Sequence, residues 1–298
     1  MKAITPNPGE EEKQMEIEAA VWNEWYPVAI MEDIADGRQY RTRILDRQIT
    51  YGRDKDGVFS ASLADGSATA CRTQTCYHTY WVSLGEPAEG FFALPEFEEA
   101  DRRVLGLGSV QIHASGLRVV ENFLDMAHFP FVHSGLLGEV PNTDVKPYRV
   151  VHDKENDEIF AKDCSFYQPM AGAAAIGGID AQYTYRVVRP LSSILYKTSV
   201  SDSSRRDVIC LFSQPISEDW CVAHLLLACI DELNSDSELR LFQQTIVGQD
   251  LTILSNHLPR TLPLDQKFEV PTRADAMSAA YRRWLSDKGI AYGTYRTA

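Results

Sequence analysis

The chain is 298 residues long and carries 42 acidic against 29 basic side chains, a formal net charge of −13. This excess of negative charge argues against binding to nucleic acid or to anionic membranes, and no stretch is apolar for long enough to span a bilayer. The length allows one large domain or one and a half. The six cysteines lack the spacing of a disulfide framework, which fits a cytoplasmic protein.

The first 110 residues fall into two predicted parts. Residues 1–18 are rich in glutamate and proline, so we expect a disordered N-terminus rather than a signal peptide. Residues 19–110 are predicted to form a small β module, because polar and apolar residues alternate within 40–60 and again in 79–84. A loop rich in proline and glutamate, 87–103, precedes the predicted boundary.

The second domain, 111–298, is predicted to begin with a helix that starts after Ser115 and ends near a proline. This helix carries the most informative stretch of the chain, Glu-Asn-Phe-Leu-Asp-Met-Ala-His-Phe-Pro-Phe-Val-His. It places Asp125, His128 and His133 among large apolar residues, where polar groups are costly unless they are paired or bind a metal. Two imidazoles and a carboxylate are what a 2-His-1-carboxylate iron site requires.

The spacing of these residues leaves two interpretations open. Asp125 and His128 are three residues apart and would share one face of a helix. Pro130 breaks the helix before His133, which could then turn back toward His128. The alternative is a pair of core histidines at a helix end with no metal.

Residues 145–231 predict an antiparallel sheet, because five strand-like runs, several of which alternate apolar and polar residues, are joined by short, turn-rich links. The runs are Glu158–Tyr167, Ala181–Val188, Ser193–Val200, Asp207–Pro215 and Trp220–Ile230. Between the first two runs, the Gly/Ala-rich stretch Met170–Gly178 is expected to be a mobile loop over a pocket.

Two helices are predicted to close the chain. Ser235-Asp-Ser-Glu238 is a capping-box pattern that starts a long helix, which ends before Pro259. The second helix runs from Arg273 to Lys288. The predicted fold class is therefore α+β, with an antiparallel sheet and a long C-terminal helix.

Asp250, on the long helix, is the candidate for a third metal ligand. The residues around it are mostly uncharged, so its carboxylate is expected to face protein and to need a partner. Gln243, Val247 and Leu254 are candidate substrate contacts, and the amide at 243 could hydrogen-bond a polar ring. The alternative is an ordinary solvated aspartate on a helix surface.

Cys71, Cys76 and His78 suggest a second metal site at first sight. Zinc sites usually pair two such clusters, and a Rieske [2Fe–2S] centre needs two cysteines and two histidines. Only one histidine lies within reach, so ordinary strand residues are the better interpretation.

On these residues the chain resembles the oxygenase subunits of Rieske-type non-haem iron oxygenases. Residues 121–133 resemble their mononuclear-iron motif, and Gly248–Asp250 resembles the helix segment that bears their carboxylate ligand. Residues 275–285 resemble their C-terminal helix, and Trp81–Pro87 resembles the end of their Rieske domain. The resemblance implies a helix-grip catalytic domain, in which the sheet grips the long helix.

The resemblance also implies roles for the central residues. His128, His133 and Asp250 would hold mononuclear Fe(II), Asp125 would orient a ligand histidine, and Asn122 would line the site. The iron would activate O2, and one oxygen atom would enter an N-methyl C–H bond before the carbon leaves as formaldehyde.

The chain departs from this family in its first module. The Cys-x-His and Cys-x-x-His pairs of a Rieske domain are missing, so we expect a vestigial Rieske-like β module without the cluster. In this respect the chain resembles the Rieske-less methylxanthine N7-demethylase component of bacterial caffeine degradation. That resemblance implies electrons from a Rieske-containing NAD(P)H reductase, a glutathione-S-transferase-like structural partner, and a homotrimer or hetero-oligomer.

The predicted function is a monooxygenase that converts 7-methylxanthine to xanthine and formaldehyde. Three alternatives remain at this stage. The chain could be a non-catalytic assembly subunit, a hydroxylase or O-demethylase of another aromatic substrate, or a hydrolase that uses the same residues on zinc. Substrate identity rests on the resemblance alone.

Overall fold

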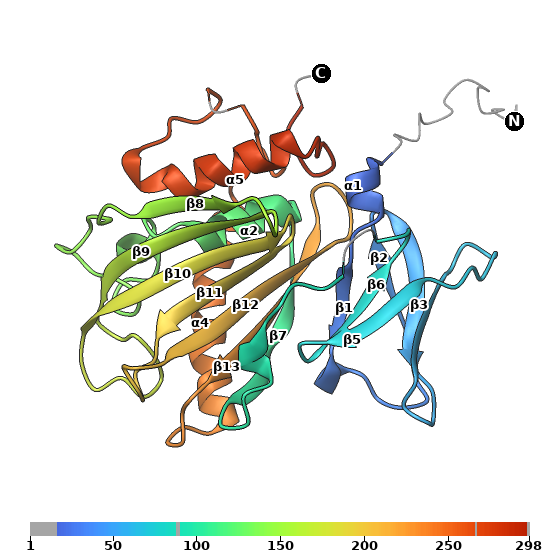
Figure 1. The fold of residues 1–298 in the computed structure, drawn as a ribbon, viewed down its shortest axis with the longest axis horizontal. Helices are drawn as coiled ribbons and strands as arrows, with labels where there is room; N and C mark the ends of the chain where they lie inside the picture. Colours follow the sequence, from blue (N-terminus) through green and yellow to red (C-terminus); the bar gives the residue numbers. More distant parts are fainter. Residues whose placement is uncertain (1–16, 88–89, 266, 297–298) are drawn as a thin grey trace, which may run out of the picture.

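The computed structural model describes residues 17–87, 90–265 and 267–296 (Figure 1). The disorder predicted for residues 1–18 therefore falls, apart from the last two positions, outside the described residues. The first described element is the short helix α1 (Ala19–Trp22). Among the described helices, none is both long and apolar enough to cross a membrane.

The N-terminal module contains two small antiparallel sheets, with strand orders β1-β6-β5 and β2-β3-β4. The strands are β1 (Tyr26–Ile30), β2 (Gln39–Ile44), β3 (Arg47–Arg53), β4 (Phe59–Leu63), β5 (Arg72–Cys76) and β6 (Thr79–Ser83), with the short 3₁₀ helices η1 (Met31–Asp33) and η2 (Pro95–Phe97). The strands predicted within 40–60 and at 79–84 are confirmed. Strand β1 is buried along its whole length, so it lacks the alternation that marks a half-buried strand.

The large sheet has seven antiparallel strands in the order β7-β13-β12-β11-β10-β9-β8. They are β7 (Arg103–Ile112), β8 (Arg149–Asp153), β9 (Glu158–Gln168), β10 (Ile179–Arg189), β11 (Ser192–Thr198), β12 (Arg206–Pro215) and β13 (Cys221–Cys229). The five predicted runs are the five inner strands, and sequential neighbours pair as expected for short links. Position 110, the predicted domain boundary, lies within β7, and the division into domains stays a prediction.

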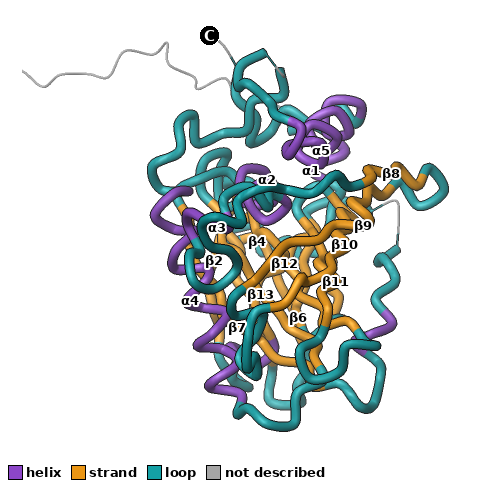
Figure 2. Tube along the Cα trace, turned by 90° about the vertical axis from the view of Figure 1, so that its left-hand side faces the viewer, coloured by secondary structure: helices purple, strands orange, loops and turns teal. Residues whose placement is uncertain are grey.

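Helix α4 (Asp236–Leu254) runs along β7 and faces the sheet (Figure 2). Its predicted capping box is present: the Ser235 hydroxyl accepts from the Glu238 backbone N–H, and the Glu238 carboxylate accepts from the Ser235 N–H. Helix α5 (Ala276–Asp287) follows the 3₁₀ turn η3 (Arg273–Asp275) and lies at the end of the sheet near α2 (Figure 1). The α+β prediction, with a sheet and a long C-terminal helix, is confirmed.

A buried ion-pair network ties α2 (Gly116–Leu124) to α5. The Arg118 guanidinium, 1% exposed, donates to Glu121 at 3.0 Å and to Glu269 at 2.6 Å. Arg282 of α5 donates to Glu121 from the other side, at 2.5 and 3.0 Å. Buried charges need such mutual satisfaction, and the network holds α2 in place at the start of the iron-motif segment.

One prediction about this segment is wrong. Helix α2 ends at Leu124, and Asp125 has extended backbone angles of φ −84° and ψ 135°, so the helix does not continue to Pro130. A separate single turn, α3 (Phe129–Val132), follows with its own proline in the first turn, where proline is tolerated. Asp125 and His128 therefore do not share a helix face.

Candidate metal centre

Asp125 closes the tight turn between α2 and α3. Its carboxylate accepts hydrogen bonds from the backbone N–H groups of Ala127 at 2.9 Å and His128 at 3.2 Å. Its Oδ2 also lies 2.7 Å from Nδ1 of His128. A short polar side chain that satisfies free backbone donors offers the chain an alternative to continuing the helix. The same carboxylate thus ends α2 and orients the His128 ring.

His133 is oriented from α4. It is 1% exposed, and its Nδ1 lies 2.8 Å from Oε1 of Gln249. The amide oxygen can only accept, so Nδ1 carries the proton and Nε2 keeps its lone pair. Gln249 is not among the predicted site residues. Its neighbour in sequence is Asp250, and adjacent residues on a helix point in directions about 100° apart, so the pattern gives no reason to place both at one site.

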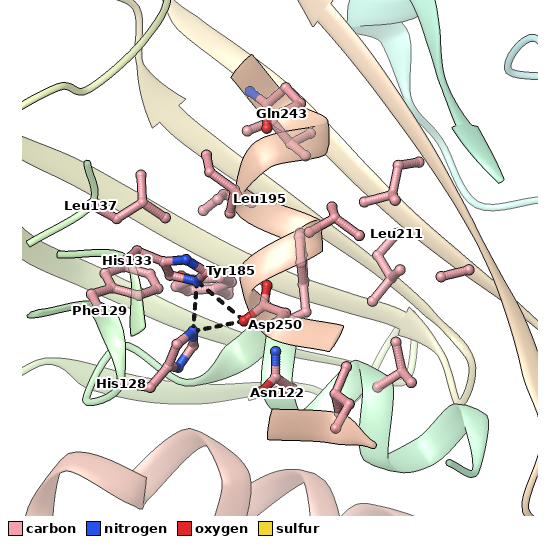
Figure 3. Close-up of a pocket in the computed structure, with 18 of the residues that line it drawn as sticks. Asn122, His128, Phe129, His133, Leu137, Tyr185, Leu195, Leu211, Gln243 and Asp250 are labelled. Carbon is pink, nitrogen blue, oxygen red and sulfur yellow. Dashed lines mark hydrogen bonds and ion pairs between the residues drawn. The ribbon is translucent and has the colours of Figure 1, made fainter. Parts of the chain in front are cut away.

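Three ligand atoms converge where α3 meets α4 (Figure 3). Nε2 of His133 lies 3.1 Å from Nε2 of His128 and 3.1 Å from Oδ1 of Asp250, and the third edge, from His128 to Asp250, is 3.4 Å. Among the described residues this is the group of His, Cys, Asp and Glu atoms that could hold a metal ion.

The three residues fit a mononuclear divalent metal. An ion about 2.1 Å from each atom and bound at right angles needs ligand atoms about 3.0 Å apart, close to the observed edges. Asp250 Oδ1 is buried and accepts no hydrogen bond among the described residues, as expected of an atom that coordinates a metal ion. Two imidazoles and one carboxylate on one side leave other positions open, which is the arrangement of non-haem iron oxygenase sites.

The electrostatics of the centre favour positive charge. Burial opposes a charged ring, but the carboxylates of Asp125 and Asp250 raise the pKa of His128 to about 9. Burial also disfavours the Asp250 carboxylate, yet His128 and His133 lower the pKa of Asp250 to about 2. A divalent cation would compete with the proton for the same position.

An apolar cavity adjoins the centre, between the large sheet and helices α2 and α4. Its walls are mostly aliphatic and aromatic. The predicted substrate contacts Gln243, Val247 and Leu254 all line it, as does Asn122. Polar lining residues that the sequence pattern does not indicate are Tyr183, Tyr185 and Lys197, all on neighbouring strands of the sheet. They look like ordinary members of alternating strands, so periodicity alone cannot assign them to a site.

The cysteine-containing stretch of the N-terminal module has a different environment. His78 pairs with Glu32, with 2.8 Å between Nε2 and Oε2. Cys71 and Cys76 are both free and partly buried. Within the described part of the chain, no three such side chains converge here to hold a metal.

Comparisons with known proteins agree with this geometry. The family model of the vanillate O-demethylase oxygenase C-terminal domain matches residues 112–288. The probable methylxanthine N7-demethylase NdmC of Pseudomonas sp. strain TJI-51 is 49% identical over 276 residues, which are 93% of this chain and 97% of that protein. Methylxanthine N1-demethylase NdmA of Pseudomonas putida is 28% identical over 175 residues, 58% of this chain and 47% of its own length.

Solved structures show the same fold. Pseudomonas putida CBB5 NdmA with caffeine superposes with a TM-score of 0.73 at 17% identity, covering 90% of each chain. Dicamba monooxygenase bound to 3,6-dichlorosalicylic acid gives a TM-score of 0.71 at 14% identity, covering 90% of this chain and 97% of its own. The family model spans more than half of the chain and the sequence relative nearly all of it, so the chain belongs to the Rieske-type non-haem iron oxygenases and is an oxidoreductase of that family.

Proposed function

We propose that the chain is the oxygenase component of a methylxanthine N-demethylase, which releases the N7-methyl group of 7-methylxanthine as formaldehyde. The observation that carries this proposal is the 49% identity with a probable N7-demethylase over 97% of that protein's length. The converging His128, His133 and Asp250 support a catalytic role over that of an assembly subunit, because an idle buried triad would be a costly polar cluster.

We assign His128, His133 and Asp250 as the ligands of one Fe(II). When bound, the iron supplies the site where O2 is activated so that one oxygen atom enters a substrate C–H bond. Asp125 and Gln249 hold the Nδ1 protons of the two histidines, so Nε2 of each ring is the atom that faces the metal position. Each orienting group restrains one ring in the tautomer that metal binding requires.

The cavity residues position the substrate. The aliphatic and aromatic walls of the cavity suit the faces of a flat ring and exclude water from the reacting methyl group. Gln243 lies seven residues before Asp250, about 10 Å along the helix axis. A fused ring can therefore present its methyl group at the metal end while its polar edge reaches Gln243. Val247 and Leu254 form part of the apolar wall, and Asn122 lines the metal end.

Electrons are proposed to come from a separate Rieske-containing NAD(P)H reductase, with no [2Fe–2S] cluster in this chain and a vestigial Rieske-like module at 19–110. The absence of a cluster is supported by His78, the single histidine near Cys71 and Cys76. Its ring pairs with the Glu32 carboxylate. Asp125 is 24% exposed at its side chain and lines an outer cleft with Glu269 and Ser278. We propose that the partner's cluster approaches the centre through this cleft.

The remaining assignments rest on the family resemblance and on the free thiols. We propose a homotrimer or hetero-oligomer, with a glutathione-S-transferase-like structural partner, in the cytoplasm. All six cysteines are free, which suits a reducing compartment.

The test is iron and acid-labile sulfide per chain in anaerobically purified protein, followed by formaldehyde release from 7-methylxanthine with a Rieske-bearing reductase. The proposal expects iron, no labile sulfide, and formaldehyde only when the reductase is present. A protein that takes up no Fe(II) would be a non-catalytic subunit. Formaldehyde from aromatic methyl ethers but not from methylxanthines would indicate an O-demethylase instead.

A further inference from the structure

Lys197 places a buried cation in the wall of the substrate cavity. It lies on β11 and is 5% exposed. Its side chain lines the cavity beside the metal centre and also a second cavity under the Gly/Ala loop (Met170–Gly178). Gln243 lines the same two cavities from α4. Lys197 from the sheet and Gln243 from the helix therefore line the same two cavities. Gln243 lies at the end of the cavity away from Asp250 (Figure 3).

The protein satisfies this ammonium group incompletely. Nζ donates one hydrogen bond, to the backbone carbonyl of Ala171 in the Gly/Ala loop. The Tyr183 ring lies 5.9 Å from Nζ, which adds a weak cation–π attraction. An ammonium group has three N–H donors, and within the described residues the hydrogen bond of Lys197 to Ala171 uses one of them.

Such a group is costly to retain in an apolar cavity. Burial lowers the pKa of Lys197 to about 8, and the Asp207 carboxylate, which lines the second cavity with it, opposes that shift, so the side chain is still mostly cationic at pH 7. A methionine of similar length would avoid the desolvation cost. A buried cation with donors to spare, facing a cavity, points to a ligand that completes its hydrogen bonds.

We propose that Lys197 is a specificity-determining residue that donates to an exocyclic carbonyl oxygen of the substrate ring; this inference rests on the proposed demethylase function. The Gln243 amide, which lines the same two cavities, can both donate and accept. An ammonium and an amide together match an edge on which C=O and N–H groups are adjacent. That is the edge of a cyclic imide or lactam, the chemical class to which xanthines belong.

The test compares two ligands that share ring and methyl group. 7-Methylxanthine carries the carbonyl oxygens, and 7-methylpurine lacks them. We expect Lys197→Met to bind 7-methylxanthine about 10- to 100-fold more weakly than the wild type, the loss of one hydrogen bond from a charged donor. Binding of 7-methylpurine, measured in the same calorimeter, should change less than about threefold. In turnover assays with the reductase, KM for 7-methylxanthine should rise while kcat stays within about threefold.

A control variant separates recognition of the substrate by Lys197 from a purely structural role of this side chain. Lys162→Met, the same substitution on β9 outside the cavity, should leave both affinities unchanged. Equal binding of 7-methylxanthine by the wild type and Lys197→Met would overturn the inference, and so would an equal loss for both ligands, which would mark Lys197 as a structural tie to Ala171. A wild-type protein that neither binds nor demethylates 7-methylxanthine would overturn the proposed function and this inference together.

Discussion

Gln249 Oε1 lies 2.8 Å from Nδ1 of His133, although 116 residues separate the two in the chain. The residue that follows Gln249 is Asp250, so one turn of α4 supplies both a candidate ligand and the group that orients another ligand. The position of α4 along the sheet therefore decides the geometry of the whole centre.

We predict that Gln249→Leu weakens iron binding by about 10- to 100-fold, the usual effect of removing a partner that orients a ligand histidine. Competition with a chelator under anaerobic conditions would measure it. Gln249→Glu keeps an acceptor for the His133 Nδ1 proton and should retain most of the affinity. If the leucine variant binds iron as tightly as the wild type, the hydrogen bond does not orient the ring.

Asp250→Ala should remove bound iron without unfolding the sheet. Two imidazoles alone would hold the metal at least about 100-fold more weakly. Asp250 is only partly buried on α4, and within the described residues its ion pairs join it to the other two candidate ligands, so the sheet should keep its fold. Iron per chain and the far-UV circular dichroism melt would be measured side by side. Full iron occupancy in this variant would mean that another residue is the third ligand.

Arg282→Met should destabilise the protein by about 3–5 kcal/mol, because it leaves the buried Glu121 carboxylate short of a partner. Urea unfolding at pH 7 would give the free energy change. Arg283→Met, the same substitution at the exposed neighbouring position, is the matched control and should change stability by less than about 0.5 kcal/mol. Similar values for the two variants would show that the network contributes little.

The loss of stability at acidic pH should depend on His224. This ring is 2% exposed, with Nδ1 2.9 Å from the Ser109 hydroxyl and Nε2 3.2 Å from the Gln214 amide oxygen. Burial lowers the pKa of His224 to about 3, so between pH 6.5 and 3 the unfolded chain binds a proton that the folded chain does not. The free energy of unfolding therefore carries no penalty from His224 above about pH 6.5. Below that pH it decreases by up to about 1.4 kcal/mol per pH unit.

Urea unfolding of wild type and His224→Gln at several pH values would measure this loss. The wild-type curve should fall more steeply than that of the variant below pH 6.5, and the two should run parallel above it. Parallel curves over the whole range would show that His224 binds its proton equally well in the folded and unfolded chains, so that burial does not lower its pKa.

Local sequence signals predicted most of the regular structure correctly. The capping box at Ser235 and the alternation in β9 and β10 act through neighbouring residues, so they can be recognised without a structure. The helix expected to reach Pro130 failed because Asp125 satisfies backbone donors with its own carboxylate and ends α2 early. His128 and Asp125 still meet, through a turn rather than along a helix face.

By itself, the sequence determined the residue types of the candidate ligands, the order of strands and helices, and the long helix that carries Asp250. These depend on residue chemistry and on periodicities of a few residues. Only the tertiary structure decided that Gln249 would reach His133 and that Lys197 and Gln243 would line the same cavity. The physical reason is that such contacts join residues tens of positions apart, and they depend on how α4 is placed against the sheet. No local pattern encodes that placement, because it results from packing summed over the whole core.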